Sequence, residues 1–408
     1  MYIKNEILKK NNSKVISTKV SDKTFTLQFL PECMYDLENI KTIEYKEFKL
    51  KTDYIIDITH SLLLKYYFKK DNRFPLNSIV LKDKYGFMYN QYINYMVDNN
   101  IIVMIKNYQT GLTSRVYALN DDIFRNKIKR YRNSDKVLIK KYKLKFVDMF
   151  DDSVKDLIDT EVKEKLVSDL FNVKIEYGRA IFYLNSVKYH DYDVYNRNIY
   201  SVESINNKHI FYHFDSYGRM HTNYTILKSF IRKNCLLIDG EETCELDIAN
   251  SQPLFLTKLI ADSKTKWVNP DEFELFKQLT ISGKYYQYMM DMLGETNKKK
   301  VKEMTYKVLF GRNIGHSKID KSFKSIFPTI HNFIKLYKKE HDDYKVLAYD
   351  LQKAESDLIF NKIIKRIINT HPHIKMITIH DSIVIPKKDR DIASIIFQDE
   401  LAKEFDLI

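Results

Sequence analysis

The sequence predicts an α+β fold, and three patterns along the chain lead to this prediction. Helical stretches at 58–68 and 89–99 precede two strand-like runs between residues 101 and 119. Near the C-terminus, β-branched runs on either side of Asp381 are typical of a hairpin that turns at this residue. Between these parts, residues 298–310 present the same helix face at every fourth position.

The composition predicts a globular protein with an anionic partner. The chain has 408 residues, enough for two or three domains, and its 44% hydrophobic content excludes a wholly disordered chain. The formal net charge is +13 and the isoelectric point is near 9.1. Lys and Arg supply most of the non-specific affinity for nucleic acid, so phosphate groups are the expected partner. An AT-rich genome also raises the lysine content, and the charge alone does not decide between these two origins.

Cysteine usage and hydropathy predict a cytoplasmic location. Cys33, Cys235 and Cys244 are odd in number and lack Cys-x-x-Cys spacing, so neither a disulfide framework nor a zinc site is expected. The N-terminus lacks the apolar core of a signal peptide, and no run of about 18 apolar residues occurs. We expect a monomer that does not associate with a membrane.

An N-terminal module is predicted for residues 1–120, although no function is evident for residues 1–55. From residue 58 onward, two helices, a strand, a turn at Asn107–Gly111 and a second strand follow the order of a winged helix. In such a module a helix reads DNA and the hairpin tip contacts the backbone. A small module that only supports its neighbour would show the same order. The polar residues of the expected recognition helix include Asn90, Gln91 and Asn94, and none of its residues is a lysine or arginine.

A basic run follows this module, with Asp135 as its only acid. Such a run is either a solvated linker or a track for phosphate groups. From Asp151 to Val173 an acidic helical pattern takes over, which suggests the start of a larger C-terminal unit. The cations of the run are Arg125, Lys127, Lys129, Arg130, Arg132, Lys136, Lys140, Lys141, Lys143 and Lys145.

Two carboxylates at the ends of strand-like runs are candidates for a metal site. Asp247 ends a short apolar run, and Asp381 interrupts Met376–Pro386. Two carboxylates on adjacent strand ends are what a two-metal site requires. A capping acid at a strand-to-helix junction is the alternative interpretation of Asp247.

The helix face of residues 298–310 combines two cations with two aromatic rings. These are Lys298, Lys302, Tyr306 and Phe310, each four residues from the next. The combination suits a triphosphate and a base. A solvated lysine face and two core rings form the alternative interpretation.

A polar turn at Phe214–Thr222 precedes the Asp247 strand by about thirty residues. Its Gly218-Arg219 pair can present a guanidinium to a phosphate or a base edge, because glycine lets the backbone approach closely. By itself such a turn is common, and its place before Asp247 makes it informative.

Taken in order, these motifs resemble those of the superfamily that contains family A DNA polymerases and single-subunit phage and mitochondrial RNA polymerases. The resemblance covers residues 214–385, about two fifths of the chain. It implies a right-hand polymerase core, with both aspartates on an antiparallel palm sheet and helical fingers at about 271–334. The matching segments are Ser216–Arg219, Asp247–Gln252 (motif A), Lys298–Gly311 (motif B), Gln352–Asp357 and His380–Ser382 (motif C).

The sequence departs from the DNA polymerases within these motifs. His380–Ser382 ends in serine, as in the RNA polymerases, where the DNA enzymes have glutamate. Phe310 replaces the tyrosine before the motif B glycine, and Lys298 replaces an arginine. Gln252 stands where the DNA enzymes carry the glutamate that excludes a ribose 2′-hydroxyl. The choice between dNTPs and rNTPs is therefore left open.

For the metal site, the resemblance implies that Asp247 and Asp381 hold two Mg²⁺ ions, with Mn²⁺ as an alternative ion and the Ile248 carbonyl as a further ligand. Lys302 would neutralise charge as pyrophosphate leaves, with Lys298 near the γ-phosphate.

For the nucleotide and the DNA, the resemblance implies contacts from six side chains. Tyr306 and Gln252 would lie near the sugar and base of the nucleoside triphosphate, and Phe310 would stack at the template position. Arg219 and Gln352 would contact the minor groove of the primer–template, where the acceptor pattern is nearly independent of sequence. His380 would support the primer end.

The predicted domains are an N-terminal module at 1–120, a basic linker with a reduced thumb-like region at 121–210, and a palm-and-fingers core at 211–408. The Asp-x-Glu spacing of a proofreading exonuclease occurs at Asp36–Glu38 and Asp159–Glu161, and neither pair lies in a strand-like run. No proofreading domain is therefore expected.

The sequence thus predicts a DNA polymerase that extends a primer with dNTPs, from the replication machinery of a phage, virus or mobile element. Two alternatives remain. An RNA polymerase or primase of the same superfamily, with RNA among its partners, is favoured by His380–Ser382 and the winged-helix order. A non-catalytic DNA-binding replication protein is the other.

Overall fold

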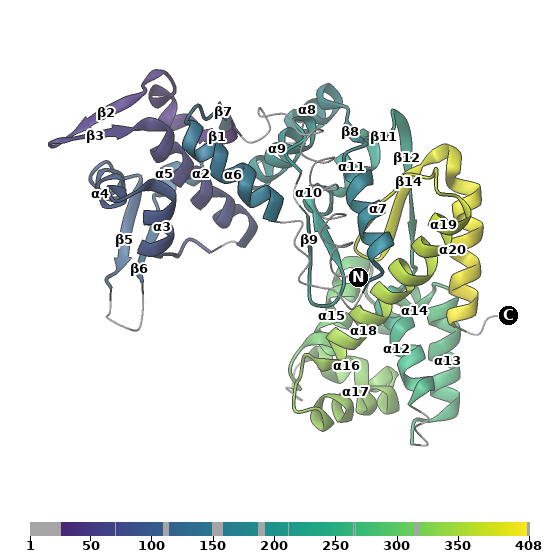
Figure 1. Cartoon of the computed structure of the whole chain (residues 1–408). Coiled ribbons are helices and arrows are strands. Elements are labelled where there is room, and N and C mark those ends of the chain that lie inside the picture. Colours follow the sequence, from purple (N-terminus) through teal and green to yellow (C-terminus); the bar gives the residue numbers. More distant parts are fainter. Residues whose placement is uncertain are drawn as a thin grey trace, which may run out of the picture. The chain divides into compact units, whose positions relative to one another are not determined.

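The computed structural model describes residues 26–69, 71–108, 114–148, 158–186, 192–210, 212–263, 265, 267–313 and 318–405. The fold is mixed α+β and mostly helical, with several small antiparallel sheets (Figure 1), which confirms the predicted α+β class. The chain forms two compact units. The first comprises residues 1–153, 173–212 and 222–237, and the second 154–172, 213–221 and 238–408. None of the helices in the described ranges is both long and apolar enough to cross a membrane.

The first unit begins with two antiparallel strand pairs around a long helix. β1 (Leu27–Pro31) pairs with β7 (Ile128–Arg132), and β2 (Thr42–Tyr45) pairs with β3 (Phe48–Lys51). The helix α2 (Thr52–Lys69) carries Asp57, a fully buried carboxylate. The Tyr85 hydroxyl donates to Asp57 at 2.6 Å, and the Lys84 ammonium lies 2.7 Å from it. These partners hold the next helix against α2.

A three-stranded sheet and two short helices follow α2 in the first unit. The strand order is β4-β6-β5, with both pairings antiparallel. The helix expected at 89–99 and the strands expected between 101 and 119 are confirmed, whereas one strand and one helix before them were not predicted. The turn expected at Asn107–Gly111 lies partly outside the described residues. The elements are β4 (Phe74–Leu76), α3 (Ser78–Tyr85), α4 (Tyr89–Asp98), β5 (Ile102–Lys106) and β6 (Arg115–Leu119).

The remaining elements of the first unit are mainly helices. The predicted basic run begins at Arg125, directly after α5, and extends through β7 and most of α6 to Lys145. β8 and β11 are neighbouring strands. The elements are α5 (Asp121–Phe124), α6 (Lys136–Asp148), β8 (Val173–Ile175), α8 (Tyr177–Ser186), α9 (Asp193–Asn206), α10 (Asn223–Ile226), α11 (Ser229–Cys235) and β11 (Leu236–Ile238), whose last residue belongs to the second unit.

The second unit contributes three strands to the largest described sheet. β14 (Ser382–Pro386) lies between β13 (Ile377–Ile379) and β12 (Glu241–Asp247), and both pairings are antiparallel. All five residues of β14 are buried, because this central strand has neighbours on both edges and its β-branched side chains pack on both faces. The hairpin predicted at Asp381 and the strand predicted to end at Asp247 are both confirmed.

Six helices follow β12, and they gather at one end of this unit (Figure 1). Asparagine side chains begin two of them by accepting backbone N–H groups: Asn269 caps α13 and Asn297 caps α15. The helical pattern expected at 271–334 is therefore confirmed. The helices are α12 (Ser251–Asp262), α13 (Pro270–Ile281), α14 (Tyr285–Leu293), α15 (Lys298–Phe310), α16 (Lys318–Ile326) and α17 (Pro328–Glu340).

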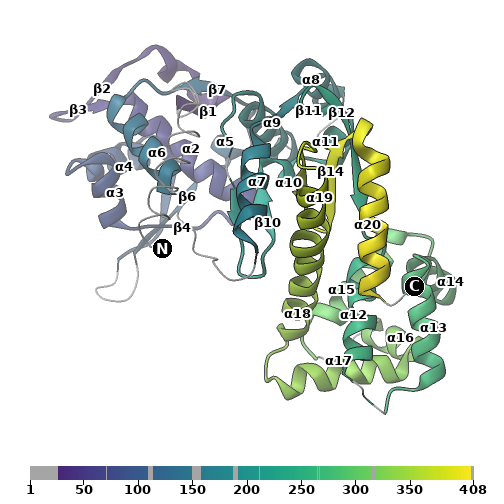
Figure 2. The ribbon, with the colours of Figure 1, turned by 45° about the vertical axis from the view of Figure 1, so that its right-hand side comes forward.

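A long helical rod completes the second unit. α18 (Val346–Ser356) continues through a π-helical stretch, η3 (Asp357–Ile364), into α19 (Lys365–Thr370). Figure 2 shows α18 and α19 in line beside α20 (Arg390–Glu404), which follows the short 3-10 helix η4 (Lys387–Asp389). Leu358, Ile359 and Ile363 in the π-helical stretch are fully buried.

The expected acidic helix forms as α7 (Thr160–Leu170), and residues 149–157 of that stretch lie outside the described residues. Asp159 caps this helix, and Asp36–Glu38 lie in a 3-10 helix, η2 (Glu32–Asn39). As predicted, neither of these two Asp-x-Glu pairs is in a strand. Short strands β9 (Tyr212–Phe214) and β10 (Met220–Thr222) frame the turn that precedes Asp247 in sequence.

Candidate active site

The register of β12 and β14 brings the two predicted aspartates to one place. Asp247, the last residue of β12, lies opposite Ser382, the first residue of β14. Asp381 directly precedes Ser382, so the two carboxylates occupy adjacent strand ends. The Ser382 hydroxyl lies 2.7 Å from Oε1 of Glu245, which links the two strands beside the aspartates.

Two residues near the aspartates in sequence adopt a left-handed backbone conformation, one directly before Asp381 and one three residues after Asp247. His380, in the two-residue turn between β13 and β14, has φ 53°, and Asn250, at the start of α12, has φ 55°. For residues other than glycine this conformation costs free energy and clusters at functional sites. The two strained positions flank the ends of the strands that carry Asp381 and Asp247.

Asp381 lies in a concentration of negative charge. Its pKa is raised to about 7, first because the carboxyl is buried and then because of the charges on Glu355 and Asp247. The Arg219 guanidinium opposes this shift only weakly. Burial and like charges both disfavour ionisation, so this end of the sheet favours a bound cation.

Glu355 is the centre of this site, and it was not among the residues predicted from sequence. Its side chain is almost fully buried on α18 and forms an ion pair with Arg219. The Gln252 amide donates to Oε2 of Glu355 at 2.6 Å, and the Ser251 hydroxyl donates to the same oxygen. One carboxylate therefore holds the turn before β10 and the first turn of α12. Two sequence signals point to it: it lies within the matching segment Gln352–Asp357, and it is three residues after Gln352, on the same helix face.

Asp215 shapes the turn that carries Arg219. Its Oδ1 accepts the backbone N–H groups of Tyr217 at 2.9 Å and of Arg219 at 3.0 Å. Gly218 has φ +84°, and a Cβ atom there would lie 3.4 Å from the Cβ of Ser356 on α18. The positive φ favours glycine here, whereas the added Cβ atom would only make ordinary van der Waals contact with the helix. These contacts hold the turn in place independently of the ion pair between Arg219 and Glu355.

The predicted face of α15 is turned toward the carboxylates at its C-terminal half. The rings of Tyr306 and Phe310 are stacked, with centroids 5.4 Å apart and an interplanar angle of 17°. Burial is the main cause of the raised pKa of Tyr306, and the charges on Asp381 and Glu355 add to it. Lys302 is exposed, with its ammonium 5.5 Å from the ring centroid of Tyr286.

The other predicted site residues lie at different distances from this centre. Lys298 is exposed in the first turn of α15, eight residues before Tyr306, and so lies about 12 Å along the axis from that ring. Gln352 is half-buried on α18, one turn before Glu355. His380 is exposed, with its ring centroid 6.2 Å from that of His221. The Ile248 side chain is buried.

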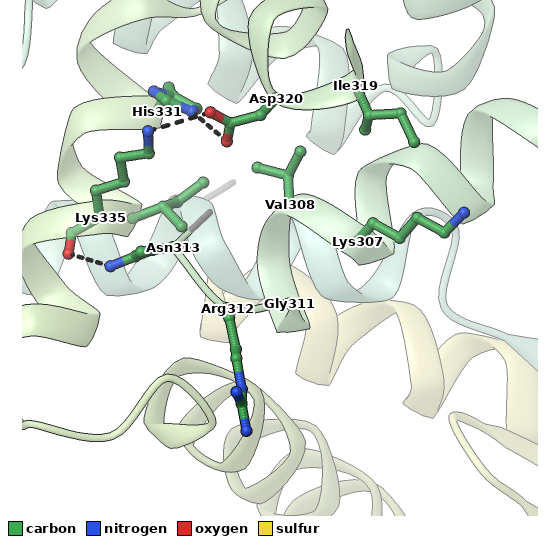
Figure 3. Close-up of a pocket in the computed structure, with 10 residues that line it drawn as sticks. Lys307, Val308, Gly311, Arg312, Asn313, Ile319, Asp320, His331 and Lys335 are labelled. Carbon is green, nitrogen blue, oxygen red and sulfur yellow. Dashed lines mark hydrogen bonds and ion pairs between the residues drawn. The ribbon is translucent and has the colours of Figure 1, made fainter. Parts of the chain in front are cut away.

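A separate hollow lies among α15, α16 and α17 (Figure 3). It measures about 220 Å³ and is lined by Lys307, Val308 and Gly311 of α15 and by residues of α16 and α17. Asp320 lies 2.8 Å from His331 and 3.1 Å from Lys335 across it. None of the predicted site residues lines this hollow, so it is distinct from the carboxylate site.

Comparison with known proteins found no matching family model, no matching curated protein and no matching solved structure. Within the described residues, no cluster of three or more His, Cys, Asp or Glu side chains is arranged to hold a metal ion. A functional proposal for this chain has to rest on the geometry around Asp247, Asp381 and Glu355.

Proposed function

We propose that this protein is a template-directed nucleotidyltransferase, a DNA polymerase that extends a primer with dNTPs during replication of a phage, virus or mobile element. The observation that carries the proposal is the pairing of Asp247 with the start of β14, which places its carboxylate next to that of Asp381. The cationic and aromatic face of α15 supports it, since Tyr306 interacts electrostatically with Asp381.

The carboxylates suit a divalent metal. Asp247 and Asp381, with the Ile248 carbonyl, would hold Mg²⁺, and Mn²⁺ could replace it. Burial is the largest cause of the raised pKa of Asp381, and the charges on Glu355 and Asp247 add to it. A bound cation would offset those two charges, which Arg219 offsets only weakly. When bound, two such ions would activate the primer 3′-hydroxyl and bind the incoming triphosphate.

The remaining side chains would bind and orient the substrates. Lys302, exposed on α15, would neutralise the charge of the triphosphate, and Lys298 would lie near the γ-phosphate. The stacked pair of Tyr306 and Phe310 offers ring faces to a nucleotide and to a template base. Gln252, held by Glu355, would lie near the sugar.

Three residues would contact the primer–template. Arg219 is paired with Glu355, and Gln352 lies one turn before Glu355 on α18. Both side chains would contact the minor groove of the primer–template. His380, exposed in the turn before Asp381, would support the primer end.

An RNA polymerase or primase is the second candidate, and the sheet of the first unit favours it. Helix α2, strand β4, helices α3 and α4, and strands β5 and β6 follow the order of a winged helix, and the strand order β4-β6-β5 fits that module. Asn90 and Asn94 are exposed on α4, the helix that would enter a DNA groove. Such a module could recognise an origin or promoter.

The test is nucleotide incorporation on primed and unprimed single-stranded templates with Mg²⁺, with dNTPs and rNTPs supplied separately. Asp247→Ala and Asp381→Ala should abolish incorporation, whereas Asp262→Ala, which removes an exposed acid at the end of α12, should not. Extension of only the primer by dNTPs supports the DNA polymerase. Joining of rNTPs without a primer would establish the second candidate.

Activity that survives both substitutions would refute the two-metal site. DNA binding that depends on residues 60–119, without incorporation in any mixture, would point to a non-catalytic replication protein instead.

A further inference from the structure

Three tyrosines lie together outside the carboxylate site, on three different parts of the second unit. Tyr217 belongs to the turn before β10, Tyr344 precedes α18, and Tyr349 lies in its first turn. The rings of Tyr217 and Tyr349 are stacked, with centroids 4.6 Å apart and an interplanar angle of 15°. A hydrogen bond with Tyr217 is the main cause of the raised pKa of Tyr349, about 12, and Asp343 and Tyr344 contribute. The third tyrosine lies five residues before Tyr349 in the chain, within electrostatic range of its hydroxyl.

Two cations accompany these rings. The Arg312 guanidinium lies 5.2 Å from the ring centroid of Tyr344, and the Lys345 ammonium lies 5.7 Å from it. Both cations are exposed, and all three rings are half-buried. Figure 3 shows that Arg312 extends away from Asp320 and His331, so it does not belong to the ion pairs of the hollow. We call Tyr217, Tyr344, Tyr349, Arg312 and Lys345 the tyrosine strip.

The tyrosine strip adjoins the candidate active site through two elements. Tyr349 lies six residues before Glu355 on α18, a separation of about 9 Å along the helix axis. Tyr217 lies two residues before Arg219 in the same turn. A strand that reached the strip could therefore continue along α18 to the carboxylates.

The stacked rings of Tyr217 and Tyr349 could serve only to pack the turn against α18. Other contacts, however, already hold the turn in place. Asp215 fixes the backbone of the turn, Gly218 packs on Ser356, and Arg219 is paired with Glu355. Packing also gives no reason for a guanidinium over the third ring. Half-buried rings with exposed cations are the combination by which proteins hold single strands, because bases stack on the rings and phosphates meet the cations.

We propose that the tyrosine strip binds unpaired nucleotides of a single strand. Bases stack on the tyrosine rings, and backbone phosphates meet Arg312 and Lys345. The identity of the strand rests on the proposed function: in a template-copying enzyme it is the unpaired part of the template. Single-stranded DNA and single-stranded RNA both offer stacking bases and backbone phosphates, and the test compares the two.

The test is binding of single-stranded oligonucleotides that carry 2-aminopurine, whose fluorescence is quenched when the base stacks. Tyr349→Ala and Tyr344→Ala should weaken binding at least about fivefold and reduce the quenching. Tyr349→Phe should retain both, because it keeps the ring. Tyr288→Ala, which removes a half-buried tyrosine of α14, is the matched control and should bind like the wild type.

Further measurements distinguish binding by the tyrosine strip from general electrostatic attraction and from loss of folding. Arg312→Gln should lower the slope of log affinity against log salt by about one, and binding of blunt duplex DNA should respond little to the tyrosine variants. Tyr349→Leu keeps apolar volume for packing but lacks a π face, so it should bind as weakly as Tyr349→Ala. DNA and RNA strands are measured side by side, and tighter binding of either one identifies the strand.

Unchanged affinity and quenching in folded Tyr344→Ala and Tyr349→Ala would overturn the proposal. This outcome is distinct from failure of the proposed function, because binding is measured without nucleotides and incorporation is measured separately. Stacking that depends on the strip in a protein without incorporation would refute the polymerase and leave the single-strand site standing.

Discussion

The carboxylate of Glu355 is paired with the guanidinium of Arg219, and both groups are largely withdrawn from solvent. The same carboxylate accepts hydrogen bonds from Gln252 and Ser251 at the start of α12, just beyond the strand that ends at Asp247. Because Glu355 also raises the pKa of Asp381, one buried acid connects the turn, the start of α12 and the carboxylate of Asp381.

Glu355→Ala should destabilise the protein by about 3 kcal/mol, because it leaves the Arg219 guanidinium largely buried without its partner. Glu355→Gln should cost less, since an amide still accepts from Arg219. Urea unfolding of the whole protein measures the loss of stability in both variants. Glu340→Gln, at an exposed acid in the last turn of α17, is the control. Equal stability of Glu355→Ala and the control would contradict the role assigned to Glu355.

Without divalent metal, the stability of the protein should fall as the pH rises from about 4 to about 7. The pKa of Asp381 is raised from 3.8 to about 7 in the folded state, so the folded state keeps a proton that the unfolded chain has released. Asp381→Asn removes this dependence and should stabilise the protein above pH 7, by at most about 4 kcal/mol. Urea midpoints between pH 5 and pH 8 with a chelator test this, and a wild type more stable at pH 8 than Asp381→Asn would refute it.

Mg²⁺ should stabilise the wild-type protein at pH 8, because an ion bound only by the folded state shifts the unfolding equilibrium. At a concentration about a hundred times the dissociation constant, the expected gain is about 2.7 kcal/mol. Asp247→Asn and Asp381→Asn should each abolish most of this gain, whereas Asp262→Asn should keep it. Thermal unfolding with and without Mg²⁺ measures the effect. A gain that persists in both variants would place the metal elsewhere.

Gly311→Ala should disturb the end of α15. A Cβ atom at this position would lie 2.3 Å from the carbonyl oxygen of Lys307, so the backbone must move, at a cost of about 1–3 kcal/mol. The Lys338 ammonium donates to the Gly311 carbonyl at 2.9 Å and would also be displaced. Because Phe310 directly precedes this glycine, incorporation should fall with stability. Gly178→Ala, where nothing lies within 4 Å of the added Cβ, is the control and should not destabilise the protein.

Much of the secondary structure could be predicted from the sequence, because it depends on local patterns. The β-branched runs around Asp381 determine a hairpin, and the spacing of residues 298–310 determines one helix face. The helix at 89–99 and the strands between 101 and 119 follow from the same kind of pattern. The short elements β4 and α3 were missed, since three to eight residues carry little periodic signal.

The sequence by itself therefore determined that two aspartates end or interrupt strands and that α15 carries lysines and aromatic rings on one face. Only the tertiary structure decided that Asp247 lies opposite the residue after Asp381, because strand register depends on packing between segments more than a hundred residues apart. It also decided the role of Glu355. Neither its hydrogen bonds nor its burial has a local signature, since both arise where α18, α12 and the turn at Arg219 meet.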